Sequence, residues 1–436
     1  MKLIVFALGL ATLFATNSFA GETLSLKLVP ERGYVLRHSP QEVVIKIDLS
    51  AVTEKKKGQR TPLNLAVVLD RSGSMTGAKI EKAKQAAMQL VDRLHADDIF
   101  SFVIFSDDAR VIVPAQRVED KDALKDKIES IRAEGSTALY AGVKTGSSQI
   151  EEYLSSKRIN RVILLSDGLA NVGPSTPRDL RRLGSQLAER GISVTTIGVG
   201  DDYNEDLMAG LAEASDANYY YVKDTETLPE IFAKELGDLL RVAARDVRIE
   251  IICPDGVKPL GFIGRTEKFE HQKAVVTLSQ FTPGQNRYLF LRCRIDGDQS
   301  DVANVNVNYT DELDGSISRN ASGIAKINFT DNQDESEKSV DHAVFAQKEL
   351  MLTAVAKDEA MAQADSGNYQ AAAQILSRQN ATLNAAYGGA PASVQMQIRA
   401  ETNYLNDFSG QLNQGSYNGS TRKAMQQQSY NARNSK

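Results

Sequence analysis

The middle of the chain alternates short apolar runs with longer amphipathic stretches. The apolar runs predict strands at residues 63–69, 99–105, 161–165, 193–199 and 219–222. They lack the strict alternation of a sheet with one solvated face, so we expect both faces to be covered. Between them, apolar positions recur at helical spacing at residues 79–94, 122–131, 139–154, 178–190 and 228–242. This order predicts a doubly wound, Rossmann-like α/β domain with an essentially parallel sheet over residues 62–243.

Short strands with alternating polar and apolar residues lie on both sides of this domain. They are expected at residues 24–28, 43–49, 247–252, 273–278, 288–295, 302–309 and 323–329, separated by Pro-Asp-Gly, Pro-Gly and Asp-Gly turns. This pattern predicts a β-sandwich. The economical topology inserts the α/β domain into one sandwich, in which residues 21–61 pair with residues 245–330. Two separate small β domains are the alternative.

The end of the chain is rich in Ala, Gln and Asn. Apolar residues recur at helical spacing over residues 335–413, which predicts a helical hairpin or bundle. The stretch GNYQAAAQIL resembles half of a tetratricopeptide unit, but no repeat follows at that period, so a plain bundle is favoured. Residues 414–436 are polar and carry only positive charges, which predicts a disordered tail.

The first residues predict export. A positive head at Met1-Lys2 precedes an apolar stretch, residues 3–15, and the small-x-small sequence Ser18-Phe19-Ala20. This is the layout of a secretory signal peptide over residues 1–20. The stretch is short of the roughly 20 apolar residues of a membrane helix, and no later run approaches that length. We therefore expect a periplasmic or secreted protein without a transmembrane span after cleavage.

Charge and cysteine content narrow the possible partners and the redox state. The 436 residues carry a net charge of −5, so nucleic acid is not an expected partner. The two cysteines, Cys253 and Cys293, each lie within an alternating strand pattern. In an oxidising compartment this predicts a disulfide, with two buried free thiols as the alternative.

Oxygen-bearing side chains gather where the predicted strands end. Asp70, Ser72 and Ser74 follow the first strand, Thr137 opens a helix, and Asp167 ends the strand that begins at residue 161. The carboxyl ends of parallel strands meet at one edge of the sheet, where ligands collect. Hydroxyls with two carboxylates suit a hard divalent cation, Mg²⁺ first and Ca²⁺ or Mn²⁺ next. Zinc is disfavoured, because the four histidines have no ligand spacing.

This set resembles the metal-ion-dependent adhesion site of von Willebrand factor type A domains. The pattern of that site is Asp-x-Ser-x-Ser, a distant Thr and a later Asp, and all of its positions are present here: Asp70, Ser72, Ser74, Thr137 and Asp167. The whole layout looks like secreted bacterial proteins described as calcium-activated chloride channel homologues and, more distantly, like inter-alpha-trypsin inhibitor heavy chains. Channel activity is not expected, because nothing here can form a membrane-spanning pore.

The resemblance implies a binding function. Ser72, Ser74 and Thr137 would reach the ion, and Asp70 and Asp167 would act directly or through water. A glutamate or aspartate of a partner protein would take the remaining position. The predicted function is that of a divalent-metal-dependent protein-binding module, for adhesion or complex assembly, and not of an enzyme.

Two alternatives remain. The first is a Mg²⁺-dependent hydrolase with Asp70 as nucleophile, but the second acid expected two residues later is Ser72. The stretch GSMTGAK also fails the spacing of a phosphate-binding loop. The second is a scaffold in which the metal is purely structural and the helical end binds the partner.

Overall fold

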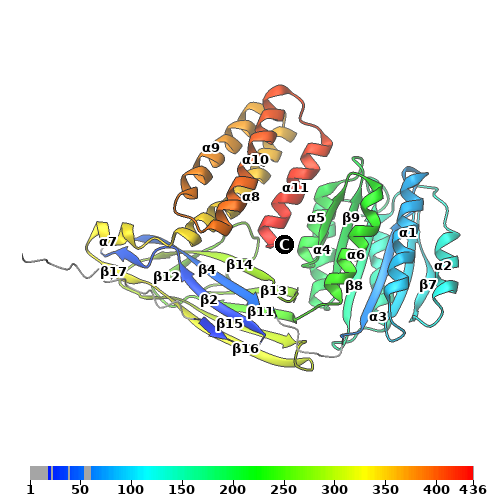
Figure 1. Cartoon of the computed structure of the whole chain (residues 1–436), viewed down its shortest axis with the longest axis horizontal. Coiled ribbons are helices and arrows are strands. Elements are labelled where there is room, and N and C mark those ends of the chain that lie inside the picture. Colours follow the sequence, from blue (N-terminus) through cyan, green and yellow to red (C-terminus); the bar gives the residue numbers. More distant parts are fainter. Residues whose placement is uncertain (1–17, 21–22, 38–39, 54–59, 436) are drawn as a thin grey trace, which may run out of the picture.

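The computed structural model describes residues 18–20, 23–37, 40–53 and 60–435. Most of the predicted signal peptide lies outside these residues. Its last part, β1 (Ser18–Ala20), pairs antiparallel with β2 (Leu24–Pro30). The chain forms three parts, an α/β domain, a β-sandwich and a group of helices, as Figure 1 shows.

The α/β domain is built on a six-stranded sheet in the order β10-β9-β8-β5-β6-β7. All neighbouring strands are parallel except β7, which runs antiparallel to β6. The predicted strands are confirmed, and β7 is an addition. It is an edge strand containing Pro114, which cannot donate a ladder hydrogen bond and is tolerated at an edge. The strands are β5 (Leu63–Asp70), β6 (Ile99–Phe105), β7 (Ala109–Arg117), β8 (Ile159–Ser166), β9 (Ser193–Val199) and β10 (Tyr219–Val222).

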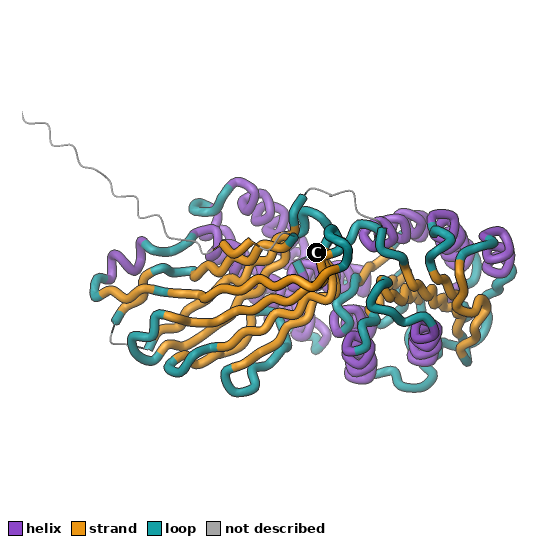
Figure 2. The backbone as a smooth tube through the Cα atoms, turned by 90° about the horizontal axis from the view of Figure 1, so that it is seen from below, coloured by secondary structure: helices purple, strands orange, loops and turns teal. Residues whose placement is uncertain are grey.

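Helices cover both faces of this sheet, as Figure 2 shows. One face packs against α1 (Ala78–Arg93), α2 (Lys121–Glu129) and α6 (Leu228–Leu239). The other packs against α3 (Leu139–Glu152), α4 (Pro177–Glu189) and α5 (Glu205–Ala214), of which α5 was not predicted. Two single turns of 3-10 helix, Gly73–Met75 and Thr225–Thr227, precede α1 and α6.

Strand β5 is apolar from Leu65 to Leu69 because both of its faces are buried. Leu65 and Val67 point into the core beside α1, whereas Ala66 and Val68 point into the core beside α3. A strand buried on both faces has no solvated position to fill with a polar residue. Its carboxyl end, at Asp70, therefore emerges from a fully buried strand.

The sandwich consists of two antiparallel sheets, with strand orders β1-β2-β4-β14-β12 and β13-β11-β15-β16. Strand β4 pairs with β14 from Gln41 opposite Ile295 to Ser50 opposite Asn286. The insertion topology is thus confirmed, and the alternative of two separate β domains is wrong. The remaining bounds are β4 (Gln41–Ala51), β11 (Ala244–Ile252), β12 (Val257–Phe262), β13 (Lys273–Phe281), β14 (Asn286–Ile295), β15 (Asp301–Asp311) and β16 (Ile317–Lys326), with a parallel pair of β3 (Tyr34–Leu36) and β17 (Asn328–Thr330) beside them.

The two cysteines lie in the sandwich core. Both are buried, and their Sγ atoms lie 3.8 Å apart as free thiols. An S–S bond is about 2.05 Å long, so these side chains are neighbours without being bonded. The disulfide between Cys253 and Cys293 stays a prediction.

Helices make up the rest of the chain. A short helix, α7 (Gln333–Lys338), leads to α8 (His342–Asp365), α9 (Tyr369–Tyr387), α10 (Ala392–Gln414) and α11 (Gly419–Asn434). Helices α8, α9 and α10 share one apolar core, as a bundle requires. Within the residues that the structure describes, no helix combines the length and the apolar character needed to cross a membrane.

The prediction of a disordered tail from Gln414 is wrong, because α11 forms there. Asn418 caps the helix by accepting a hydrogen bond from the Thr421 amide at 3.0 Å. Met425 and Tyr430 are completely buried. The helix lies between the other helices and α5 of the α/β domain (Figure 1), where carboxylates of α5 and α8 neutralise its positive charges. These carboxylates lie outside residues 414–436, so the composition of the tail could not predict that α11 is ordered.

Candidate metal centre

The loop after β5 is shaped by the first acid of the motif. Asp70 is completely buried. Its Oδ1 accepts a hydrogen bond from the Ser72 amide at 2.8 Å, and its Oδ2 accepts one from Ser166 Oγ at 2.5 Å. The Gly73 amide donates to the carbonyl of Gly135 at 3.0 Å, which ties this loop to the one before α3. The acid thus holds its own loop in place and joins β5 to the end of β8.

The hydroxyls of the motif lie together at the same edge of the sheet. Ser72 Oγ and Ser74 Oγ are 3.0 Å apart, and Ser74 Oγ donates to Asp167 Oδ1 at 2.7 Å. Thr137 joins them at Gly168, where an added Cβ would lie 2.9 Å from Thr137 Oγ1 and 3.5 Å from Ser74 Oγ. The structure therefore brings together all the residues predicted for the site.

The oxygen spacing fits a small octahedral cation. Neighbouring oxygens around Mg²⁺, each about 2.1 Å from the ion, lie about 3.0 Å apart. The Ser72–Ser74 and Ser74–Asp167 separations of 3.0 Å and 2.7 Å are close to this value. Ser74 is exposed, whereas Asp70 and Asp167 are completely buried, so the group is open to solvent on the Ser74 side.

Neighbouring loops hold the threonine and its segment in position. Asn171 Oδ1 accepts a hydrogen bond from the Thr137 backbone amide at 2.9 Å, and the Asn171 backbone amide donates to the Thr137 carbonyl at 3.2 Å. Asp107 accepts one from the Ser136 amide at 3.0 Å. Gly135 has φ of +84°, a backbone conformation that favours glycine, and an added Cβ would lie 2.7 Å from Asp107 Oδ2.

The two acids differ in their surroundings. Burial raises the pKa of Asp70 to about 6, although hydrogen bonds from Ser166 and Ser72 oppose the rise. Asp167 instead pairs with a cation, because Lys79 Nζ donates to its Oδ2 at 2.5 Å. Within the described part of the chain, no lysine or arginine forms a salt bridge with Asp70.

Sequence reasoning missed the supporting residues. Ser166, Lys79, Asn171 and Asp107 all bond to the motif or to its loops. Ser166 stands directly before Asp167 at a strand end, and Lys79 lies in the first turn of a predicted helix, but neither residue belongs to a motif that points to its contact with the site. Among the described residues, no cluster of three or more His, Cys, Asp or Glu could hold a metal, so a site here depends on hydroxyls.

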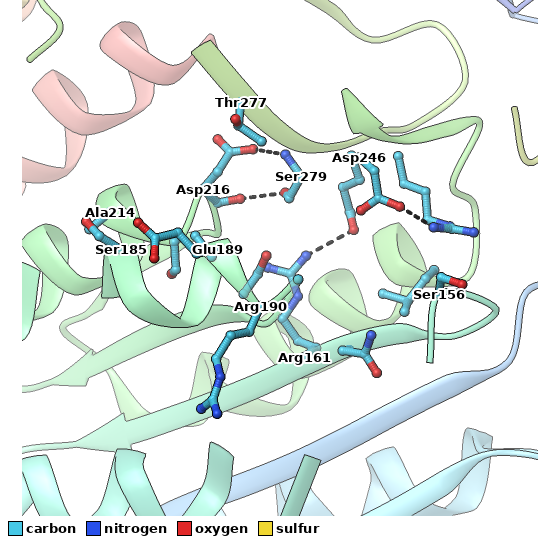
Figure 3. A pocket seen from close by; sticks show the side chains of 18 of the residues that line it. Ser156, Arg161, Ser185, Glu189, Arg190, Ala214, Asp216, Asp246, Thr277 and Ser279 are labelled. Atoms are coloured by element: carbon cyan, nitrogen blue, oxygen red, sulfur yellow. Dashed lines mark hydrogen bonds and ion pairs between the residues drawn. The ribbon is translucent and has the colours of Figure 1, made fainter. Parts of the chain in front are cut away.

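A cavity of 660 Å³ lies elsewhere, between the α/β domain and the sandwich (Figure 3). Hydrogen bonds connect residues of the two parts along its lining. Ser279 Oγ donates to the Asp216 carbonyl at 2.6 Å, and Arg161 donates to Gln280 Oε1 at 3.0 Å. These hydrogen bonds link the α/β domain to the sandwich beside the cavity.

Residues 64–234 match the von Willebrand factor type A domain. This stretch holds all six strands of the sheet except Leu63, the first residue of β5, and it includes the loops of the candidate site. The chain therefore contains a von Willebrand factor type A domain, and the expectation of this domain is confirmed.

The sequence matches to related proteins cover different lengths of this chain. The uncharacterized protein sll0103 of Synechocystis sp. is 30% identical over 272 residues, which cover 59% of this chain and 64% of that protein. Inter-alpha-trypsin inhibitor heavy chain H3 of Homo sapiens is 28% identical over 160 residues, 35% of this chain and 18% of that protein. The expected similarity to these heavy chains is confirmed. The chain spans less than two thirds of the length of either relative.

The arrangement of all three parts has a counterpart among solved structures. The structure of a von Willebrand factor type A protein from Catenulispora acidiphila superposes with a TM-score of 0.68. The match covers 92% of this chain and 91% of that one at 18% identity. At this identity the likeness shows the fold, and it extends well beyond the α/β domain.

Proposed function

We propose that this protein is a divalent-metal-dependent binding module that takes an acidic residue of a partner protein at the edge of its α/β sheet. The observation that carries the proposal is the meeting of Ser72, Ser74 and Thr137 with two buried aspartates. Mg²⁺, or Ca²⁺ or Mn²⁺ in its place, would supply a positive centre that accepts a carboxylate.

The residues would contribute different groups to the binding of the ion. Ser74 and Ser72 offer neutral hydroxyl oxygens, and Thr137 offers a third from the neighbouring loop. Asp70 and Asp167, both buried, would contribute negative charge directly or through water. Neutral hydroxyls leave a divalent cation with much of its charge, so an incoming carboxylate is attracted to the exposed side near Ser74.

The place of action would be the periplasm or the extracellular space. The support is the apolar stretch over residues 3–15 followed by Ser18-Phe19-Ala20. Fractionation of cells that produce the full chain tests this part: we expect a mature protein beginning at Gly21 outside the cytoplasm. A full-length cytoplasmic protein would contradict it.

Metal binding and partner binding are measured in two separate experiments. Wild-type protein should bind Mg²⁺ in titration calorimetry, and partner capture from an extract should require Mg²⁺ and stop with EDTA. The double variant Ser72→Ala, Ser74→Ala should lose both. Unchanged capture by this folded variant would contradict the proposal and favour the scaffold, whereas Mg²⁺-dependent phosphate release abolished by Asp70→Ala would favour the hydrolase.

A further inference from the structure

Lys79 places a fixed positive charge beside the proposed metal site. It lies in the first turn of α1, and its Nζ donates to Asp167 Oδ2 at 2.5 Å. The lysine side chain is 27% exposed, whereas the Asp167 side chain is 0% exposed. Arg71, the cation within the motif loop itself, bonds to Glu134 instead. Lys79 is therefore the cation that the structure directs at the motif.

This contact makes the two acids of the site unequal. Asp167 uses Oδ2 for Lys79 and Oδ1 for Ser74, while Asp70 accepts hydrogen bonds from Ser72 and Ser166 and pairs with no lysine or arginine among the described residues. The lysine offsets one of the two carboxylate charges. A bound divalent cation would then exceed the remaining negative charge, and the site would be positive overall.

We propose that Lys79 acts as a built-in counter-charge that weakens metal binding and strengthens the capture of a partner's carboxylate. The inference rests on the proposed function. Its physical basis is that an ammonium group close to the ion repels a cation and attracts an anion, and that burial of Asp167 reduces solvent screening. The two effects have opposite signs, whereas a residue that merely held the loop in shape would support both steps together.

The test uses Lys79→Gln, which removes the charge and keeps a hydrogen-bond donor, with Lys79→Met as a second neutral variant. The matched control is Lys82→Gln on the same helix. Lys82 has a similar exposure of 28%, but it pairs with Glu226 at 2.6 Å and does not contact the motif. Lys79→Arg retains the charge and should behave as wild type.

Two titrations separate the effects. The first measures Mn²⁺ alone by calorimetry, and we expect Lys79→Gln to bind it about tenfold more tightly than wild type. The second adds the tripeptide Gly-Glu-Gly at saturating Mn²⁺, and we expect binding about tenfold weaker. Lys82→Gln should stay within about twofold of wild type in both, because exposed charges far from a site are screened.

The outcomes distinguish this inference from the function on which it rests. Failure of wild-type protein to bind Mn²⁺ overturns the proposed function and the inference with it. Mn²⁺ binding by wild type that is unchanged or weaker in the folded Lys79→Gln and Lys79→Met variants overturns the inference alone. The inference is also overturned if Lys82→Gln changes binding as much as Lys79→Gln does, because the effect would then come from the overall charge of the protein.

Discussion

Lys423 Nζ lies 2.9 Å from Glu205 Oε2, and both side chains are almost completely buried. Lys423 belongs to the last helix, α11, and Glu205 is the first residue of α5 in the α/β domain. Arg422 adds a bond to Glu205 Oε1 at 2.6 Å. The end of the chain is therefore attached to the same edge of the sheet as the candidate metal site, since α5 begins where β9 has ended.

The substitution Lys423→Met is expected to loosen α11. It would leave a buried carboxylate with one fewer cation, and breaking a buried ion pair from one side costs about 3 kcal/mol or more. We expect faster hydrogen exchange of the α11 amides and a lower urea midpoint. Both are measured on the full chain, by mass spectrometry and by circular dichroism.

The control is an exposed pair. Arg182→Met removes the partner of Asp179, a pair in α4 whose arginine side chain is 64% exposed. Exposed ion pairs contribute about 0 to 1 kcal/mol, so this variant should match wild type in both measurements. If Lys423→Met also matches wild type, the buried pair does not hold the helix.

Helix α11 shows where sequence reasoning ends. The apolar runs were sufficient to predict the buried strands of the α/β domain, because a strand covered on both faces consists mostly of apolar residues. The pattern of α11 is polar, and its order depends on Glu205 and Asp365, which lie far away in the sequence. The edge strand β7 was missed for a related reason, since Pro114 weakens its strand pattern although an edge position tolerates it.

Some residues of the candidate site could be predicted from the sequence, and others could not. Asp70 and Ser72 could be predicted because they belong to one short motif, Asp-x-Ser-x-Ser, directly after a predicted strand. Ser166 and Lys79 carry no motif of their own, and only the folded chain shows that they contact the two acids. Long-range hydrogen bonds of this kind have no local signal in a single sequence.

Ser166→Ala should destabilise the metal-free protein. The Asp70 carboxylate would lose its 2.5 Å hydrogen bond while staying buried, and an unsatisfied buried polar group costs about 1 to 3 kcal/mol. Urea unfolding in EDTA measures the change. Ser148→Ala is the control, because that residue is exposed and its hydroxyl bonds within its own helix, at 3.0 Å to the Lys144 carbonyl. Equal stability of the two variants would contradict the expected role of Ser166.

The cysteine pair predicts a redox-dependent stability. Protein isolated from an oxidising compartment should yield one linked peptide containing Cys253 and Cys293, because their sulfurs are already neighbours. Reduction should then lower the free energy of unfolding by about 2 to 5 kcal/mol. The Cys253→Ser variant should show no response to reductant. Recovery of two free thiols from the exported protein would contradict the disulfide and leave the pair as core residues.

Gly168→Ala should block metal binding while the protein stays folded. The added Cβ would lie 2.9 Å from Thr137 Oγ1, inside the group of oxygens, so the methyl group would displace the threonine or fill the space between them. Titration with Mg²⁺ should show at least a tenfold loss of affinity, which corresponds to about 1.4 kcal/mol. Gly237→Ala in α6 is the matched control, since among the described residues its added Cβ would meet nothing within 4 Å beyond its chain neighbours and the adjoining backbone of its own helix, and alanine favours a helix by about 1 kcal/mol. It should bind Mg²⁺ as wild type does and unfold at equal or higher urea. Wild-type Mg²⁺ affinity in Gly168→Ala would mean that the ion, if bound, does not sit among Ser74, Thr137 and Asp167.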